Sequence, residues 1–336
     1  MIKSCDISVV IQGPIMKELL ENGNFITQEV CKSIREHLPE AEIIISTWEG
    51  EHVEGLIYDK IIFSKNIKAN RIIMPWSDID KLNTVNHQII TSYEGLKLAE
   101  RKYALKLRSD LKIYGTKFLE YFNKYSDIPK NKELLSWKIF YHRLITLPTY
   151  NINKKYGLPY NICDWFFFGL TKDLLYYFET PLVDTYSFFI KPGEKYPRVE
   201  DNFGAEQLLW LQCLRKTKNI EIANAIDKTV KTKTEFEISL ANNFIPISAK
   251  QAQLINLKYG VAGYGVEPYL SHGFYTFEEW LRLYNKYGGG NIKIKNNYKE
   301  GFIYFLYQIK DSLYDNSKLF RKVYNQLIRR LKRHGT

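Results

Sequence analysis

Closely spaced cysteines, long apolar runs and a signal-peptide pattern are all missing from this sequence of 336 residues. Cys5, Cys31, Cys163 and Cys213 lie far apart and form no C-x-x-C pair, which argues against a structural zinc site. No stretch reaches the ~18 apolar residues of a membrane-spanning helix. The apolar run at 7–11 follows no basic segment and precedes no cleavage site. We therefore expect a cytoplasmic protein with free thiols.

Acidic residues are missing from residues 316–336, although the whole chain carries a net charge of +11. The basic residues of this segment are Lys318, Arg321, Lys322, Arg329, Arg330, Lys332 and Arg333. Such a segment can bind an anionic membrane or a nucleic acid. Nucleic-acid binding across a sheet requires basic and aromatic residues interleaved on one face, whereas here the charge is concentrated at one end. We expect no nucleic-acid partner.

Apolar runs alternate with helical patterns in the first third of the chain. Strands are predicted at 7–11, 42–46, 60–63 and 103–107, and helices at 27–37 and 83–99. This alternation predicts an α/β fold with a mostly parallel sheet flanked by helices. Further helices are predicted from 173 and over 204–211, and residues 223–290 are expected to be irregular. Two amphipathic helices over 300–334 suggest a basic extension, 291–336, after a main domain of residues 1–290.

Polar residues follow several predicted strands, at the edge where α/β sheets bind ligands. Gln12, Gly13 and Pro14 follow the first strand, and Thr47 follows the second. The fourth strand ends in Arg108-Ser109-Asp110. A carboxylate at this position can hold a divalent cation against a diphosphate, because hard cations prefer oxygen ligands. The alternative is an acid that caps a surface turn.

Other polar residues are weaker candidates. Asn83, Asn86 and Gln88 open a predicted helix and could bind a base or ribose, or only cap the helix. Glu206, with Asp201 shortly before it, lies near another helix start and could accept the proton of an acceptor hydroxyl. Asp164 precedes an apolar run and could bind sugar hydroxyls or stabilise a turn. His272 is a possible metal ligand, although a lone histidine is more often structural.

Six phrases of this sequence, in this order, resemble the WavE family of lipopolysaccharide-synthesis proteins. The phrases lie at 7–15, 33–39, 41–50, 86–88, 103–110 and 164–169, with a further match at 205–210. The resemblance implies a GT-A glycosyltransferase that assembles lipopolysaccharide core, O-antigen or capsule. It implies that Gln12, Gly13 and Thr47 line the nucleotide pocket, that Asp110 is the metal-binding acid and that Glu206 is the base.

Two positions depart from the expected pattern. Arg108 replaces the first acid of a D-x-D motif, so Mn²⁺ or Mg²⁺ would depend on Asp110 alone, and Arg108 could contact the diphosphate directly. His87 stands where an arginine is expected between Asn86 and Gln88.

The expected partners are a nucleotide-sugar donor, UDP-linked from the family context, and a lipid-linked or oligosaccharide acceptor. The basic segment predicts peripheral binding to the anionic inner face of the cell membrane, with packing on the main domain as the alternative. A nucleotidyltransferase or sugar-phosphate transferase is the other enzyme class considered. Those enzymes usually carry a basic, glycine-rich loop after the first strand, and residues 12–16 have no such cluster.

Overall fold

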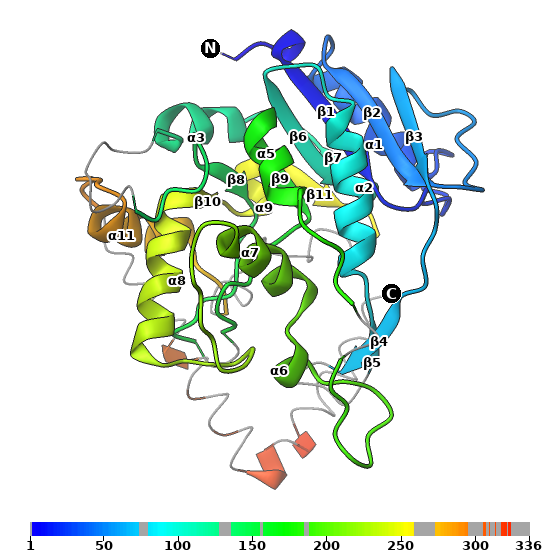
Figure 1. The fold of residues 1–336 in the computed structure, drawn as a ribbon. Helices are drawn as coiled ribbons and strands as arrows, with labels where there is room; N and C mark the ends of the chain where they lie inside the picture. Colours follow the sequence, from blue (N-terminus) through cyan, green and yellow to red (C-terminus); the bar gives the residue numbers. More distant parts are fainter. Residues whose placement is uncertain are drawn as a thin grey trace.

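The computed structural model describes residues 2–73, 80–127, 136–154, 157–184, 188–258 and 273–294, with scattered residues between 305 and 323. Seven strands form a central sheet (Figure 1). Their order is β10 (Phe244–Pro246), β8 (Leu144–Thr146), β9 (Phe166–Leu170), β6 (Tyr103–Arg108), β1 (Ile7–Gln12), β2 (Glu42–Trp48) and β3 (Lys60–Ser64). β9 is antiparallel to both of its neighbours, and the other four neighbouring pairs are parallel. The predicted α/β fold with a mostly parallel sheet is confirmed.

The central strands are mostly apolar because helices cover both faces of the sheet. Every residue of β1 and β2 is buried. Phe166 and Phe168 of β9 pack against Phe118 of α3 (Phe118–Tyr125), while Phe167 packs against Tyr177 of α5 (Thr171–Phe178). Successive side chains of a strand point to opposite faces, so α3 and α5 lie on opposite sides of the sheet.

One face of the sheet is covered by α2 (Val85–Lys97), α5 and α7 (Ala205–Arg215), which contact one another. Figure 1 shows α2 and α5 in front of the strands. The absence of a side chain at Gly95 lets α2 approach β1 and β2 closely. A Cβ atom at this position would lie 2.5 Å from Val10 Cγ1 and 2.8 Å from Ser46 Cβ. The other predicted helix, α1 (Ile26–His37), buries Val30 and the rest of its apolar stripe.

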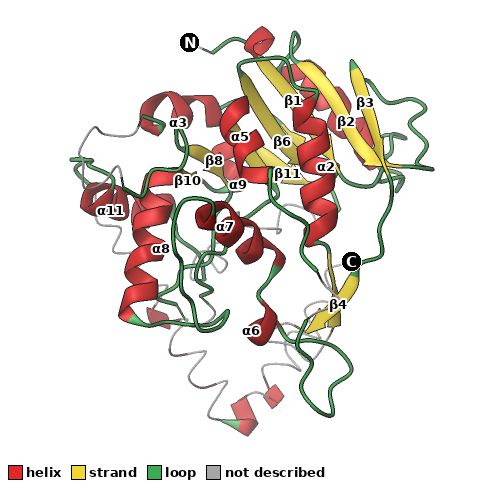
Figure 2. Ribbon diagram, in the orientation of Figure 1, coloured by secondary structure: helices red, strands yellow, loops and turns green. Residues whose placement is uncertain are grey.

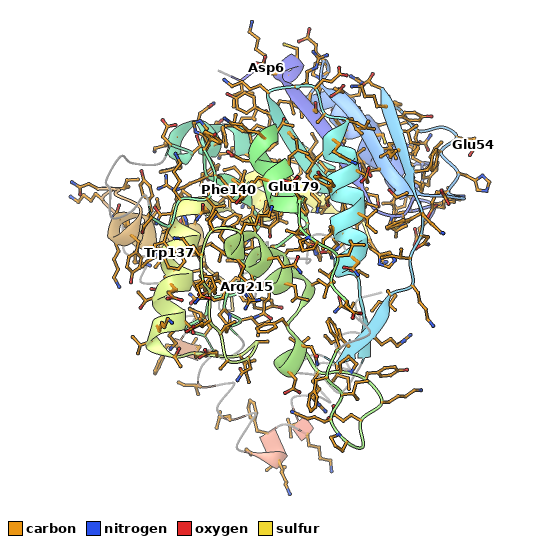
Figure 3. All side chains as sticks on the ribbon, viewed as in Figure 1. Asp6, Glu54, Trp137, Phe140, Glu179 and Arg215 are labelled. Atoms are coloured by element: carbon orange, nitrogen blue, oxygen red, sulfur yellow. The ribbon has the colours of Figure 1, made fainter. Side chains whose placement is uncertain are left out.

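The expectation that residues 223–290 are irregular is wrong for the part that the structure describes. This part contains α8 (Val230–Asn243), α9 (Ala249–Ala252), β11 (Leu254–Asn256) and α11 (Phe277–Tyr287) besides β10. Figure 2 shows α8 and α11 side by side at the end of the sheet that β10 forms. Phe140, labelled in Figure 3, is buried here against Trp210 and Phe244.

A buried arginine joins this helical end to the sheet. Arg143, next to β8, is fully buried, and its guanidinium donates to the backbone carbonyls of Tyr125, Asp127, Ala241 and Gly288. These carbonyls belong to the ends of α3, α8 and α11. The single side chain therefore satisfies backbone groups that the helix ends leave without partners.

Smaller elements lie at the periphery. They are η1 (Ser4–Asp6), the ribbon of β4 (Asn70–Ile73) and β5 (Asp80–Asn83), α6 (Val199–Asn202), and β7 (Leu111–Ile113), which pairs with β11. The four cysteines form no disulfide. No helix in the described parts of the chain is both long and apolar enough to cross a membrane.

The predicted basic extension lies largely outside the described residues. Some of the described residues in this extension are helical and have exposed apolar side chains. These are Phe305, Leu306, Ile309, Leu313, Leu319 and Val323.

Candidate active site

The ends of β1, β2 and β6 meet at one edge of the sheet. Gln12 is level with Ser46 of β2 and with Arg108 of β6. Gly13 then turns the chain with a φ of +111°, a conformation that favours glycine, and its N–H donates to the Ser46 carbonyl at 3.1 Å. Three segments that are distant in sequence therefore present their polar ends together, as predicted from the apolar runs that precede them.

Hydrogen bonds fix the loop that follows β6. Ser109 donates from its backbone N–H to the Gln12 carbonyl at 3.1 Å and from Oγ to the Pro14 carbonyl at 2.6 Å. Thr27 at the start of α1 donates to the Ser109 carbonyl at 3.1 Å. The hydroxyl of Ser109, predicted to bind the donor, thus holds the loop after β1 in place. Pro14 itself is exposed.

The residues at the ends of β1 and β2 that were predicted to line the nucleotide pocket differ in whether they contact α2. Gln12 Oε1 accepts a hydrogen bond from Thr91 of α2 at 2.7 Å. Trp48, at the end of β2, meets His87 edge to face, with ring centroids 5.0 Å apart. Thr47 is fully buried, and its hydroxyl has no partner among the described residues. Gln12, Ser46 and Trp48 therefore face α2, whereas Thr47, between the last two in β2, points to the opposite face of the sheet.

The three amide side chains just before and within the first turn of α2 differ in how many hydrogen bonds they leave for a ligand. Asn86 is fully engaged, because its amide exchanges two hydrogen bonds of 2.7 Å with the backbone of Val183. Asn83 Oδ1 accepts from the Val85 N–H at 3.2 Å, but its buried Nδ2 has no partner in the described structure. Gln88 donates to Thr84 Oγ1 at 3.2 Å, and its Oε1 likewise lacks a described partner. Asn83 and Gln88 keep hydrogen-bonding capacity for a ligand.

Arg108 and Asp110 form a charged pair at the end of β6. Arg108 Nη2 lies 2.6 Å from Asp110 Oδ2, and the guanidinium stacks on the Trp165 ring at 4.3 Å. Asp110 is 2% exposed, and its Oδ1 has no partner in the described parts of the chain. One carboxylate oxygen is thus engaged by Arg108, whereas the other is available to a ligand.

Two carboxyl groups meet beside this pair. Asp164 lies just before β9, and because β9 runs antiparallel to β6, its first residues lie level with the end of β6. Glu206, in the first turn of α7, accepts a hydrogen bond of 2.9 Å from Asn161 Nδ2 and hydrogen-bonds both the side chain and the backbone of Asp164. Burial and the neighbouring Asp164 carboxyl raise the pKa of Glu206 to about 8. Glu206 therefore keeps its proton near neutral pH, and its hydrogen bond to Asp164 joins the two groups as a pair.

A lysine that the sequence-based prediction overlooked completes this cluster. Lys106, in the middle of β6, is fully buried, and its ammonium donates to the backbone carbonyl of Asp164. It also lies near the rings of Phe167 and Phe178. Burial lowers the pKa of Lys106 to about 8, with Asp164 and Glu206 opposing this shift. A lysine within an otherwise apolar strand was the signal that could have indicated it.

Strained backbone flanks the carboxyl pair on both sides. Tyr160, beside Asn161, has a φ of +57°, and Phe203, shortly before Glu206, has a φ of +63° with a ψ of 149°. Side chains other than glycine rarely adopt these conformations, and such strain concentrates at functional sites. Only one other described non-glycine residue has a positive φ, namely Gln253 at the end of α9.

The two remaining candidates do not join this cluster in the described structure. Asp201 lies in α6, is exposed, and forms an ion pair of 3.0 Å with Lys191. His272 falls outside the described residues. The described residues contain no group of three or more His, Cys, Asp or Glu that could hold a metal ion.

Fold and site together define an α/β protein with an arginine–carboxylate pair and a proton-sharing carboxyl pair at one edge of its sheet. The chain belongs to the WavE family, described as lipopolysaccharide synthesis, which it matches over residues 7–316. No curated protein matches it. A solved structure of 4-diphosphocytidyl-2C-methyl-D-erythritol synthase from Anaerococcus prevotii DSM 20548 is similar at 11% identity, over 64% of this chain and 97% of that chain, with a TM-score of 0.31.

Proposed function

We propose that this protein is a GT-A-type glycosyltransferase that moves a hexose from a nucleotide-sugar donor, UDP-linked, to a glycan acceptor of lipopolysaccharide core, O-antigen or capsule. The observation that carries this proposal is the position of two different charged pairs at one edge of the sheet. Arg108 and Asp110 suit a donor diphosphate, and Asp164 and Glu206 suit proton transfer from an acceptor. Trp165 connects the two pairs, since it stacks on Arg108 and follows Asp164 in the chain.

The residues divide the reaction between them. Arg108 is placed to stabilise negative charge on the departing nucleoside diphosphate, because a guanidinium forms strong hydrogen bonds to phosphate oxygens. The Asp164–Glu206 pair accepts the proton of the acceptor hydroxyl as its oxygen attacks the anomeric carbon. Asn83 and Gln88 offer hydrogen bonds to the nucleoside part of the donor.

A divalent cation, Mn²⁺ or Mg²⁺, fits this site in one way. Asp110 Oδ1 is the available carboxylate oxygen, and Mg²⁺ commonly binds one or two protein carboxylates together with substrate phosphates. Asp110 would hold the cation, which would neutralise diphosphate charge when bound. His272 remains a further candidate ligand.

The test is donor binding and donor hydrolysis over a panel of nucleotide sugars, with and without Mn²⁺. A ligand that binds the native state raises the melting temperature, so no acceptor is needed. We expect UDP and a UDP-hexose to stabilise the protein, Mn²⁺ to enhance the effect, and Asp110→Ala to abolish that enhancement. Glu36→Ala is the matched control, because this exposed carboxylate lies at the far end of α1. If no nucleotide stabilised the wild type, the proposal would be refuted, and pyrophosphate release from UTP and a sugar phosphate would indicate a nucleotidyltransferase.

We propose that residues 316–336 bind the anionic inner membrane surface, where a lipid-linked acceptor resides. The segment has seven basic residues and no acidic residue, and apolar side chains just before and within it are exposed. Sedimentation with phosphatidylglycerol vesicles should retain the full chain and lose the variant that lacks residues 316–336. Equal binding to neutral phosphatidylcholine vesicles would contradict an electrostatic role for this segment.

A further inference from the structure

Lys106 has no role in the mechanism proposed above, yet it is a fully buried ammonium group in the centre of the sheet. Its one described hydrogen bond goes to the Asp164 backbone carbonyl. A buried charge is strongly destabilising unless an opposite charge compensates for it. The nearest acidic side chains that act on it are those of Asp164 and Glu206. The ammonium group and the carboxyl pair therefore form one electrostatic unit.

The charges of this unit balance when the pair holds one proton. The singly protonated pair carries one negative charge, and Lys106 carries one positive charge. The other groups that face the unit are Arg108 of β6, Cys163 before β9 and Tyr177 of α5. Arg108 is already paired with Asp110 at 2.6 Å, while burial raises the pKa values of Cys163 and Tyr177, so both stay neutral. Lys106 is the remaining cation that compensates for the pair.

We propose that Lys106 is a positioning residue that keeps the Asp164–Glu206 pair singly ionised, so that one carboxylate is ready to accept the acceptor proton. This inference rests on the proposed glycosyl transfer. In that step the acceptor O–H bond breaks and its proton goes to the ionised carboxylate of the pair. The acceptor oxygen bonds to the anomeric carbon, whose bond to the diphosphate oxygen breaks, and the electron pair leaves with the diphosphate. Lys106 keeps its own proton throughout.

Removing the ammonium group should move the pH at which the enzyme becomes active. Lys106→Met has a similar length and suits the apolar neighbours Phe167 and Phe178. Without the positive charge the pair should take up a second proton, so the acid limb of the pH–rate profile for UDP-hexose hydrolysis should rise by about 1–3 pH units. Below the shifted limb the variant should be about tenfold slower for each pH unit of the shift, with most of the rate recovered at higher pH.

A purely structural role of Lys106 would change the pH–rate profile in a different way. A misfolded or poorly packed Lys106→Met would lose activity at every pH, and an unchanged acid limb with lower overall activity would overturn the inference. Lys172→Met is the matched control, since Lys172 is an exposed lysine of α5 that lies 3.2 Å from the centre of the Tyr141 ring.

A second measurement does not depend on activity. The infrared carbonyl band of protonated carboxyl groups at neutral pH should be stronger in Lys106→Met than in the wild type. This increase should vanish when Glu206→Gln and Asp164→Asn are added to Lys106→Met. An unchanged band in Lys106→Met would refute the role of Lys106. If the wild type hydrolysed no nucleotide sugar while the band changed as expected, the proposed function would fail and the electrostatic unit would stand.

Discussion

Replacing Glu206 with glutamine should change how the stability of the protein depends on pH. The native pair holds its proton up to a pKa of about 8, whereas an ordinary glutamate has a value of 4.5. Between these values the native state binds one more proton than the unfolded state, so stability falls as pH rises. The loss is about 1.4 kcal/mol per pH unit for one proton. Glu206→Gln removes the titrating group while keeping its shape, and this slope should disappear.

The expected difference is large enough to measure. From about pH 5.5 to about pH 7.5, the wild type should lose about 2.7 kcal/mol relative to Glu206→Gln. With an unfolding entropy of about 2 cal/mol/K per residue, this corresponds to about 4 °C in melting temperature for a chain of this length. Lys106 does not change this slope. Its pKa is lowered to about 8, so its contribution makes the protein more stable with rising pH only above that value. His87, whose pKa burial lowers, contributes equally to both proteins, so its effect cancels.

The assay is urea or thermal unfolding of both proteins over this pH range. Glu221→Gln is the control, since Glu221 is an exposed carboxylate paired with Lys231, and it should keep the wild-type slope. Parallel curves for the wild type and Glu206→Gln would show that no extra proton is bound at the pair, and the assignment of the acid–base site would then be wrong.

Two further substitutions test how the site is supported. Gly95→Ala should destabilise the protein by about 1–3 kcal/mol in urea unfolding, because the new Cβ would lie 2.5 Å from Val10 Cγ1 and push α2 away from the sheet. Unchanged stability would mean that α2 packs less closely on the sheet than the structure shows. Arg143→Met should cost about 3–5 kcal/mol by leaving three buried carbonyls and one partly buried carbonyl without their donor. A loss below about 1 kcal/mol would contradict this role.

The donor side of the site was predictable because its residues follow apolar runs along the chain. Parallel strands present the residues at their carboxyl ends at one edge of the sheet, so Gln12, Thr47 and Arg108 could be placed together from the sequence. The strand boundaries agreed to within two residues in these cases. The roles assigned to these residues stay predictions.

The carboxyl pair was harder to predict because it depends on contacts between distant segments. Asp164 and Glu206 were each proposed separately, but their proximity arises from the antiparallel direction of β9 and from the packing of α7 on α5. Sequence periodicity does not encode either feature. Lys106 was passed over because it occupies a position that the strand pattern assigns to the core.

The helices after residue 223 were missed for two different reasons. α8 carries polar residues around much of its circumference, so its apolar stripe is weak. α11, in contrast, begins with a capping box, in which Thr276 accepts from the Glu279 N–H and Glu279 accepts from the Thr276 N–H. That signal was present in the sequence and was not used.

The reversed direction of β9 has a consequence for which changes in the chain the carboxyl pair tolerates. β9 is held between β6 and β8, so the sheet fixes the position of Asp164 from one side. Residues 147–160 support the pair from the other side, because most of those described are buried and the Pro159 carbonyl accepts from Gln207 Nε2 at 2.8 Å. A change of length between β8 and β9 would therefore disturb the contacts of Glu206 and Gln207, even though the strand itself holds Asp164.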